Sequence, residues 1–482
     1  MKQTIEDILQ NKFNHSSFRT GQEEAIQSIL AGNDSLVMLP TGVGKSLCYQ
    51  LPAYLLDGTV LVVSPLLSLM QDQVESLKKM GEKKVVALNS ESSFSERADI
   101  FRKINQYRFI YTSPEMLQNP RVIAALKSIK ISIFVVDEAH CISHWGTDFR
   151  PDYLVLANIR KQLGEPNTMA LTATATKEVR DEIIQFLSLD KDSTHQIIQS
   201  VDRPEIKFVV EHSQGDKDQR LKNYLKQIKG PGIVYFMSKK LADQWADRMN
   251  EVMGISAASY HSDIETDDKS KIQQQFLKNE LEVICATSAF GMGFDKKDIR
   301  FVIHYHLPAS AEMYLQEVGR ASRDGKESLA ILLYQPGDEQ IQWRFIEKSL
   351  PNQFLLEKVS RKEKIPLDVE EALIKLANYY LGISSNLETA GSLIIERRKM
   401  KEKQLYFMLD YIHTKNCKRS KLLEYFNEEK SADLKVCCSS CSFKQDEFIE
   451  RVNKINFGRL KNKKSVQIKN WKVIFNSFYN KG

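Results

Sequence analysis

Residues 39–47, which read Leu-Pro-Thr-Gly-Val-Gly-Lys-Ser-Leu, constrain the fold more than any other stretch of this chain. They follow the apolar run 36–38 and precede a segment with helical spacing. Between a strand and a helix, glycines let backbone N–H groups turn toward an anion. Lys45 would contact the outer phosphates of a nucleotide, and the Ser46 hydroxyl would hold Mg²⁺. The strict phosphate-loop pattern has a glycine where this chain has Leu39, so an ordinary turn is the alternative.

Short apolar runs alternate with amphipathic stretches over most of the chain, in two series separated by segment 200–204, which contains a proline. Buried strands that alternate with helices form parallel sheets covered on both faces. The sequence therefore predicts an α/β fold with two parallel-sheet domains in tandem. The apolar runs lie at residues 61–63, 109–111, 133–136 and 169–171, and then at 233–236, 283–286, 301–303 and 329–333.

Composition excludes a membrane protein and leaves nucleic acid open as a partner. The 482 residues are 42% hydrophobic and 27% charged, and no apolar stretch approaches the roughly 20 residues of a membrane span. The N-terminal residues lack the pattern of a signal peptide, so we expect a cytoplasmic, nucleoid-associated or nuclear protein without a membrane partner. The net charge is +6. Residues 451–482 carry nine basic and no acidic side chains, which suits phosphates, anionic lipid or plain solvation.

Two adjacent carboxylates, Asp137 and Glu138, follow the largely apolar run 131–136. Ligands of parallel sheets collect at the carboxyl ends of the strands, where this pair would lie. The first carboxylate suits a contact with Mg²⁺, and the second suits polarisation of an attacking water. Acidic pairs are also common on solvated surfaces, which is the alternative.

Four of the seven cysteines, Cys417, Cys437, Cys438 and Cys441, fall within one 25-residue span. In an intracellular protein such a cluster favours a metal over disulfides, and four thiolates hold Zn²⁺ tetrahedrally. Cys437 and Cys438 would point apart on an extended chain, so both bind only if the chain turns there. His413 lies four residues before Cys417 and is the alternative ligand in place of Cys437.

The order of these features resembles the superfamily 2 helicases, and within them the RecQ family. Residues 18–22 resemble the adenine-reading motif, and residues 39–53 resemble motif I, which needs no glycine at position 39. The resemblance runs from about residue 18 to residue 325. The other segments similar to family motifs are 64–73 (motif Ia), 171–175 (motif III), 287–295 (motif V) and 316–325 (motif VI).

The resemblance implies two RecA-like domains that close on ATP and Mg²⁺. Ser46 and Asp137 would hold the Mg²⁺, and Ser322 stands where the family usually has glycine. The implied catalytic residues are Lys45, Asp137, Glu138, Arg320 and Arg323. The implied ATP-binding residues are Arg19, Gln22, Thr41, Gly42, Val43, Gly44, Lys45, Ser46, Gly291 and Asp295.

Residues 144–150 resemble the aromatic-rich loop of RecQ proteins, whose rings stack on unpaired bases. On composition alone, Trp145 and Phe149 would more often be core residues. The implied partners are single-stranded and tailed or forked DNA, with a single-strand DNA-binding protein as a further candidate. The implied DNA-binding residues are Ser64, His144, Trp145, Phe149 and Arg150.

The resemblance also covers the cysteine cluster, where residues 417–426 look like the helix that carries the first zinc ligand. Asn427 stands where many members have glycine and suits a left-handed helix end. Too few residues follow Cys441 for a winged helix or a further helical (HRDC) domain, so we expect neither. The expected domains are 1–205 (ATP-binding, RecA-like), 206–338 (C-terminal, RecA-like), 339–448 (helical, zinc-binding) and 449–482 (basic tail).

The expected function is an ATP-dependent 3′-to-5′ DNA helicase that uses ATP, Mg²⁺ and Zn²⁺ in DNA repair or recombination. One alternative keeps the motor but makes it a translocase that strips proteins or anneals strands, with little unwinding. Another is a DNA-binding scaffold with a weak ATPase. RNA is an alternative substrate, because stacking and phosphate contacts do not distinguish the sugars.

Overall fold

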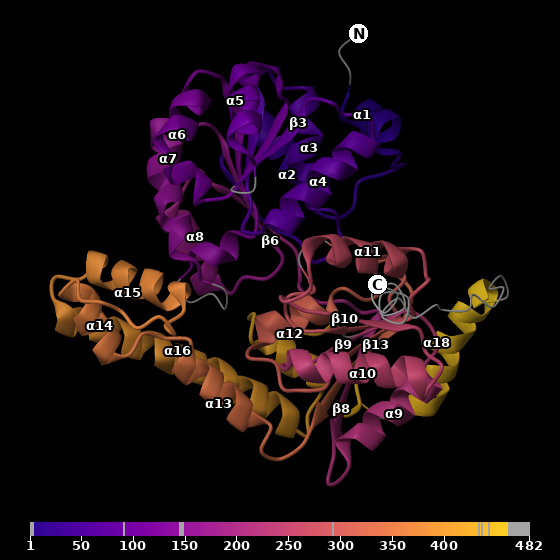
Figure 1. Ribbon diagram of the computed structural model, residues 1–482. Helices are drawn as coiled ribbons and strands as arrows, with labels where there is room; N and C mark the ends of the chain where they lie inside the picture. The colour runs from indigo at the N-terminus through magenta and orange to yellow at the C-terminus, as the bar shows by residue number, and fades with distance from the viewer. Residues whose placement is uncertain are drawn as a thin grey trace, which may run out of the picture.

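The computed structural model shows two lobes and a projecting helical arm (Figure 1). It describes residues 4–89, 92–143, 149–291, 294–431, 434, 437–441 and 444–460. The interpretation of the basic tail beyond residue 460 therefore lies outside the described residues. In the described part of the chain, no helix combines the length and apolar character needed to cross a bilayer.

The first lobe is a seven-stranded sheet in the order β3-β4-β2-β5-β6-β1-β7, and all its strand pairs are parallel. Successive strand residues point to opposite faces, so Leu36 and Met38 enter one core and Val37 enters the other. The strands are β1 (Ser35–Met38), β2 (Thr59–Val63), β3 (Val85–Leu88), β4 (Phe109–Thr112), β5 (Ile131–Val136), β6 (Thr168–Thr172) and β7 (His195–Ile198).

Helices lie on both faces of this sheet, as a parallel sheet requires. The α-helices are α1 (Ile5–Phe13), α2 (Gln22–Leu30), α3 (Leu47–Gln50), α4 (Leu67–Lys79), α5 (Phe94–Arg102), α6 (Pro120–Lys127), α7 (Leu156–Gln162) and α8 (Lys177–Phe186). The 3₁₀-helices are η1 (Pro52–Tyr54), η2 (Ile104–Gln106), η3 (Met116–Gln118), η4 (Ala139–Ile142) and η5 (Pro151–Val155).

The second lobe is a six-stranded parallel sheet in the order β10-β11-β9-β12-β13-β8. The two sheets confirm the predicted fold class, and the predicted apolar runs lie in their central strands. The strands are β8 (Ile206–His212), β9 (Gly232–Tyr235), β10 (Ala257–Tyr260), β11 (Val283–Ala286), β12 (Phe301–His304) and β13 (Ser328–Tyr334). The helices are α9 (Lys217–Gln227), α10 (Lys239–Glu251), α11 (Thr266–Leu277) and α12 (Ala311–Val318).

The chain then becomes helical, but its helices join two different cores. The arm consists of α14, α15 and the first part of α16, and it has an apolar core of its own that includes Leu356 and Tyr380. The second part of α16 instead packs Leu405 and Met408 into the core of the second lobe. These helices are α13 (Glu339–Lys348), α14 (Gln353–Ser360), α15 (Glu371–Ile383), α16 (Leu387–His413), α17 (Lys418–Glu424) and α18 (Gln445–Leu460).

Gly232 of β9 tests how tightly the second sheet is packed. Its partner in register is Phe301 of β12, and a Cβ at Gly232 would overlap that ring. We expect Gly232→Ala to lower the free energy of unfolding by about 1–3 kcal/mol, because the ring must leave its place. Chemical denaturation measures this.

The matched control is Gly382→Ala in α15, where a Cβ meets open space. Alanine is the better helix former, so this change is expected to raise stability by up to about 1 kcal/mol. Equal stability of the wild type and Gly232→Ala would contradict the packing described for β9 and β12.

Candidate functional site

A cavity of about 370 Å³ lies between the phosphate-loop region of the first lobe and the second lobe. The predicted catalytic and ATP-binding residues all line it, although they come from distant parts of the chain. From the first lobe these are Arg19, Gln22, Thr41, Gly42, Val43, Gly44, Lys45, Ser46, Asp137 and Glu138. From the second lobe they are Gly291, Asp295, Arg320 and Arg323.

The loop that follows β1 has the backbone conformation that its glycines permit. Gly42 and Gly44 have φ angles of 87° and 88°, in the left-handed region that favours glycine. Leu39 is fully buried in the core and continues β1, with its N–H donating to the Thr172 carbonyl at 3.2 Å. The departure from the strict phosphate-loop pattern therefore serves packing. Lys45 Nζ lies 3.4 Å from the carbonyl oxygen of Leu39.

Two side chains, Gln22 at the start of α2 and Arg19 just before it, hold this loop. The Gln22 amide donates to the carbonyls of Val43 and Gly44, at 2.8 and 3.0 Å. Its oxygen accepts from the Arg19 N–H at 2.8 Å, and the Arg19 guanidinium donates to the Gly42 carbonyl. The predicted adenine-reading residues therefore lie directly against the predicted phosphate loop.

The acidic pair follows β5, at the same end of the parallel strands as the loop that follows β1. Burial raises the pKa of Asp137 to about 7, Glu138 adds to the rise and Lys45 opposes it. Glu138 has a φ of 49°, a conformation that costs roughly 1–2 kcal/mol in a residue with a side chain. Its carboxylate lies 3.4 Å from His140 Nδ1, which is also 3.0 Å from Thr172 Oγ1. Such backbone strain is common at functional sites.

The arginine pair reaches the cavity from the segment after α12. Arg323 donates to the Phe294 carbonyl and to the Asp295 carboxylate, both at 2.9 Å. Burial lowers the pKa of Arg323, and Asp295 opposes that effect. Arg320 donates to the Gly291 carbonyl. A Cβ at Gly42 would lie 2.6 Å from Arg323 Cγ, so this arginine contacts the phosphate loop.

The structure shows how Ser322 is accommodated where the family usually has glycine. Its φ is 57°, so the backbone is left-handed where the family usually has glycine. The side chain is 1% exposed, and its hydroxyl donates to Ser328 Oγ at 2.6 Å. The serine therefore adds a buried hydrogen bond. Asn427 has the same kind of conformation, with a φ of 57°, which confirms the predicted left-handed helix end.

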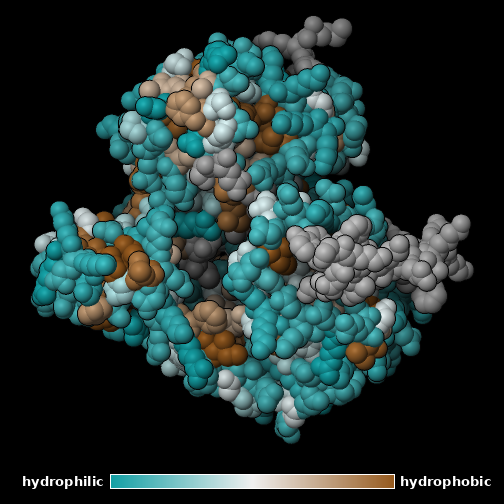
Figure 2. All heavy atoms as spheres, viewed as in Figure 1, coloured by the Kyte–Doolittle hydropathy of each residue, from teal (hydrophilic) through white to brown (hydrophobic). Residues whose placement is uncertain are grey.

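A larger groove of about 1010 Å³ lies between the two lobes and α16. Figure 2 shows a mostly hydrophilic face that is hollowed where the lobes and the arm meet. Both lobes and α16 supply cations to the groove, namely Arg150, Lys239, Lys269 and Lys401. Gln316 and Arg320 line the groove as well as the smaller cavity, so these two side chains connect the spaces.

The predicted DNA-binding residues do not all lie at this groove. Arg150 lines it and donates to the Pro65 carbonyl at 2.8 Å. Ser64 is 1% exposed, and its neighbour Pro65 lines the groove. The Phe149 ring lies 5.5 Å from the Tyr379 ring of α15, with the Arg397 guanidinium 4.8 Å from its centre. His144 and Trp145 lie outside the described residues.

The four clustered cysteines meet at one point, with their sulfur atoms all within 4.8 Å of one another. Cys417 is the N-cap residue of α17, and the other three lie in a loop that turns back, with the Cys441 N–H donating to the Cys438 carbonyl at 2.9 Å. Four of the distances between pairs of these sulfur atoms are 3.4 to 3.9 Å. Zn–S bonds of about 2.3 Å in a tetrahedron require separations near ~3.8 Å, so the donor set fits Zn²⁺.

The four sulfur atoms act strongly on one another. The hydrogen bond between Cys437 and Cys438 lowers the pKa of Cys438 and raises that of Cys437. The Lys418 N–H also donates to the Cys438 sulfur, at 3.2 Å. His413 lies elsewhere, with its ring 5.6 Å from His212 and 5.3 Å from Tyr334. The structure thus assembles the four cysteines, and His413 is not among them.

Sequence reasoning missed several residues of these sites. His15, Ser17 and Lys297 also line the nucleotide cavity. Ser17 lies two residues before Arg19, and that proximity was the available signal. His15 and Lys297 belong to no pattern that marks them. Gln316 lies in a segment that resembles a family motif, but only the fold shows that it reaches both spaces.

The fold and these sites define a two-lobed helicase. Residues 19–182 match the DEAD/DEAH box helicase family, and residues 216–325 match the helicase conserved C-terminal domain. Residues 385–443 match the RecQ zinc-binding domain. A solved structure titled "Crystal Structure of DUF1998 helicase MrfA bound to DNA" shares the fold at a TM-score of 0.59 and 19% identity. That match covers 70% of this chain and 52% of the other.

Two relatives narrow the class to a family. The chain is 44% identical to the "Probable ATP-dependent DNA helicase RecS" of Bacillus subtilis (strain 168), over 91% of this chain and 92% of that protein. It is 41% identical to the "ATP-dependent DNA helicase RecQ" of Pasteurella multocida (strain Pm70), over 70% of this chain and 53% of that protein. The chain belongs to the RecQ family of ATP-dependent DNA helicases. Family membership and the cysteine cluster support ATP and Zn²⁺ as its ligands.

The zinc centre predicts a difference between two single variants. Cys437→Ser is expected to lose bound zinc, because it removes one of four thiolates, and to unfold at a lower temperature, since metal binding contributes to folding. His413→Ala is the matched control and is expected to keep stoichiometric zinc. Elemental analysis and thermal denaturation of the purified proteins measure both. Zinc loss in His413→Ala with retention in Cys437→Ser would reverse the assignment.

Proposed function

We propose that this protein couples ATP hydrolysis to 3′-to-5′ movement along single-stranded DNA and to separation of tailed or forked duplexes, in DNA repair or recombination. The observation that carries the proposal is that Gln316 and Arg320 line both the nucleotide cavity and the groove. A conformational change at the ATP phosphates would therefore also move residues of the groove in which a DNA strand would lie. The direction of movement and the pathway follow from the family resemblance.

Each predicted residue of the nucleotide cavity has a proposed role in ATP binding or hydrolysis. Lys45 contacts the outer phosphates, Glu138 orients and polarises the attacking water, and Arg320 and Arg323 stabilise charge on the transferred phosphoryl group. Arg19 and Gln22 bind the base, while the other ATP-binding residues of the loop and of the second lobe enclose the phosphates.

Ser46 and Asp137 are the residues that would hold Mg²⁺. Both line the cavity, and the charge of Lys45 acts on the Asp137 carboxylate. When bound, the ion neutralises phosphate charge. Zn²⁺ has a structural role at the four cysteines, which lie away from the cavity lining.

The groove is the proposed path of the DNA strand. Its cations suit phosphates, and a strand there would contact both lobes and α16. Arg150 lines this path and is proposed to contact DNA. Ser64, His144, Trp145 and Phe149 are proposed as further DNA contacts because the family resemblance implies them. A protein that acts on such a strand would work at the nucleoid or in the nucleus, where a single-strand DNA-binding protein is a natural partner.

Strand separation on matched substrates tests the proposal. The wild type is expected to unwind a 3′-tailed or forked duplex with ATP, and to leave a 5′-tailed or blunt duplex paired. Lys45→Ala and Glu138→Gln are expected to lower ATP hydrolysis by about a hundredfold or more, because each loses a contact to the reacting groups. Gel or fluorescence assays measure unwinding, and phosphate release measures hydrolysis.

The outcomes separate the alternatives. ATP hydrolysis that DNA stimulates without strand separation favours a translocase or annealing factor. Hydrolysis that DNA does not stimulate would contradict the proposed coupling and favour a scaffold. Equal stimulation by single-stranded RNA would extend the substrate class beyond DNA.

Trp145 is proposed to stack on DNA, which gives a separate prediction. Trp145→Ala is expected to keep basal ATP hydrolysis and to lose most of its stimulation by single-stranded DNA, because base stacking is worth ~1–3 kcal/mol per base. The control is Phe94→Ala, which removes an aromatic of α5 that is 78% exposed. Steady-state ATPase assays over a range of DNA concentrations decide. Unchanged stimulation in Trp145→Ala would count against the stacking role.

A further inference from the structure

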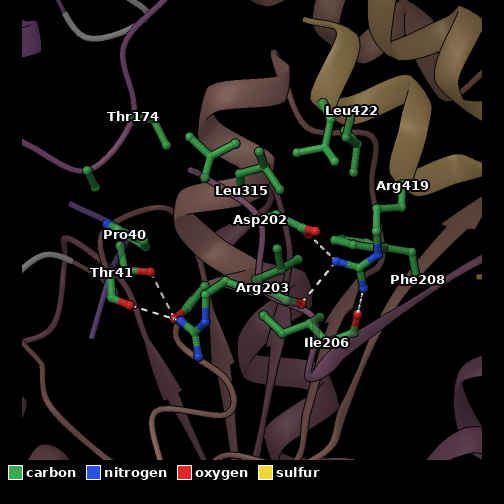
Figure 3. A pocket seen from close by; sticks show the side chains of 15 residues that line it. Pro40, Thr41, Thr174, Asp202, Arg203, Ile206, Phe208, Leu315, Arg419 and Leu422 are labelled. Carbon is green, nitrogen blue, oxygen red and sulfur yellow. Dashed lines mark hydrogen bonds and ion pairs between the residues drawn. The ribbon is translucent and has the colours of Figure 1, made fainter. Parts of the chain in front are cut away.

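Arg203 lies in the linker between β7 of the first sheet and β8 of the second, and Figure 3 shows its side chain beside Thr41. It donates to the carbonyl of Thr41 at 2.9 Å, in the first lobe. In the second lobe it donates to Gly319 at 3.3 Å, Ala321 at 3.3 Å and Ser322 at 2.8 Å. One side chain of the linker therefore binds four carbonyls on two bodies.

These carbonyls belong to the two halves of the nucleotide cavity. Thr41 precedes Gly42 of the phosphate loop, and residues 319–322 include Arg320 and directly precede Arg323. The Thr41 hydroxyl also donates to the Gly319 carbonyl at 2.9 Å. The place of the arginine pair relative to the phosphate loop thus depends on what Arg203 binds, although Arg203 is absent from the described lining of the cavity.

The residue type suits this task. A guanidinium carries five N–H donors in a rigid, planar fork, whereas a lysine ammonium has three donors on a flexible stem. Arg203 places two fork nitrogens on carbonyls, and its Nε lies 3.5 Å from the Glu205 carboxylate. Carbonyl oxygens of two lobes can be held at a fixed separation by such a fork but not by a point charge.

A second arginine, which belongs to the zinc-binding module, holds the backbone of Arg203 in place. Arg419 of α17 is fully buried and donates to the Arg203 carbonyl at 3.0 Å. It also donates to the Asp202 carboxylate and the Ile206 carbonyl, and its guanidinium lies 5.0 Å from the centre of the Phe208 ring. Figure 3 shows Arg419 reaching the linker from α17.

Helix α17 is itself fixed by both lobes. Leu422 belongs to the core of the second lobe, whereas Leu423 and Phe426 belong to that of the first. Arg419 follows Cys417 by two residues on the same segment. A continuous set of contacts therefore leads from the zinc centre, through the linker, to the nucleotide cavity.

We propose that Arg203 is a positioning residue for ATP hydrolysis, and that Arg419 of the zinc module holds it in place. Arg203 keeps Arg320 and Arg323 against the phosphate loop. Its bond to Thr41 is the one that must break when the lobes separate, since its other partners move with the linker and the second lobe. The inference rests on the proposed function, because it assumes that this cavity hydrolyses ATP.

Steady-state kinetics of the full chain test the role. Arg203→Gln is expected to lower kcat about tenfold or more while the KM for ATP changes less than about twofold, because misplaced reacting groups slow chemistry more than binding. Arg203→Lys is expected to recover only part of the loss. Arg419→Gln is expected to lower kcat in the same direction and to keep stoichiometric zinc.

The matched control is Arg160→Gln. Arg160 is a mostly buried arginine of the first lobe that bonds Asp34 at 2.9 Å and Thr168 Oγ1 at 2.7 Å, and it does not contribute to the described lining of the cavity. It is expected to keep the kcat of the wild type. Zinc content, thermal unfolding and binding of single-stranded DNA are measured for all variants.

Different measurements test the positioning role of Arg203 and the proposed function. A basal kcat in Arg203→Gln equal to that of the wild type would overturn the positioning role. So would a fall in kcat that Arg160→Gln shares, or one that accompanies loss of zinc and of folded protein. Failure of the wild type to hydrolyse ATP faster with DNA would instead overturn the proposed function, whereas the positioning role is tested by basal kcat, which is compared between variants without DNA.

Discussion

The close approach of the phosphate loop to the segment after α12 is the interaction on which the functional architecture depends. Thr41 bonds the Gly319 carbonyl at 2.9 Å, and neither Gly42 nor Gly319 has room for a Cβ on the side that faces the other lobe. Glycine at both positions lets the two lobes meet backbone against side chain. Larger residues would hold the arginine pair away from the loop, and the cavity would lose one wall.

Parallel sheet geometry explains why the chemistry collects at this place. The phosphate loop follows β1, the acidic pair follows β5 and Thr174 follows β6, and these strands are neighbours in the sheet. The carboxyl ends of these strands lie at the same end of the sheet, where ligands of such sheets bind. Gln316 donates to Thr174 Oγ1 at 3.2 Å, so the second lobe contacts the same end of the sheet. The fold thus brings together residues that are far apart in sequence.

The central strands could be predicted from the sequence, whereas the edge strands could not. Central strands are buried on both faces and form continuous apolar runs. The unpredicted strands β3, β7, β8 and β10 are the four sheet edges, where polar residues such as His195 are allowed. In the same way, the nucleotide residues lie in local motifs that a sequence displays. Arg203 and Arg419 act through contacts between distant segments, which no local pattern records.

The loop that carries Cys437, Cys438 and Cys441 has a consequence beyond metal binding, because it covers part of β8, an edge strand of the second sheet. Cys438 forms a parallel bridge with Phe208 of β8, and the Ser439 N–H donates to the Phe208 carbonyl at 2.8 Å. An uncovered edge strand offers unpaired backbone groups to other chains and promotes aggregation. By pairing with Phe208, the loop that carries Cys437, Cys438 and Cys441 shields part of this edge of the second sheet.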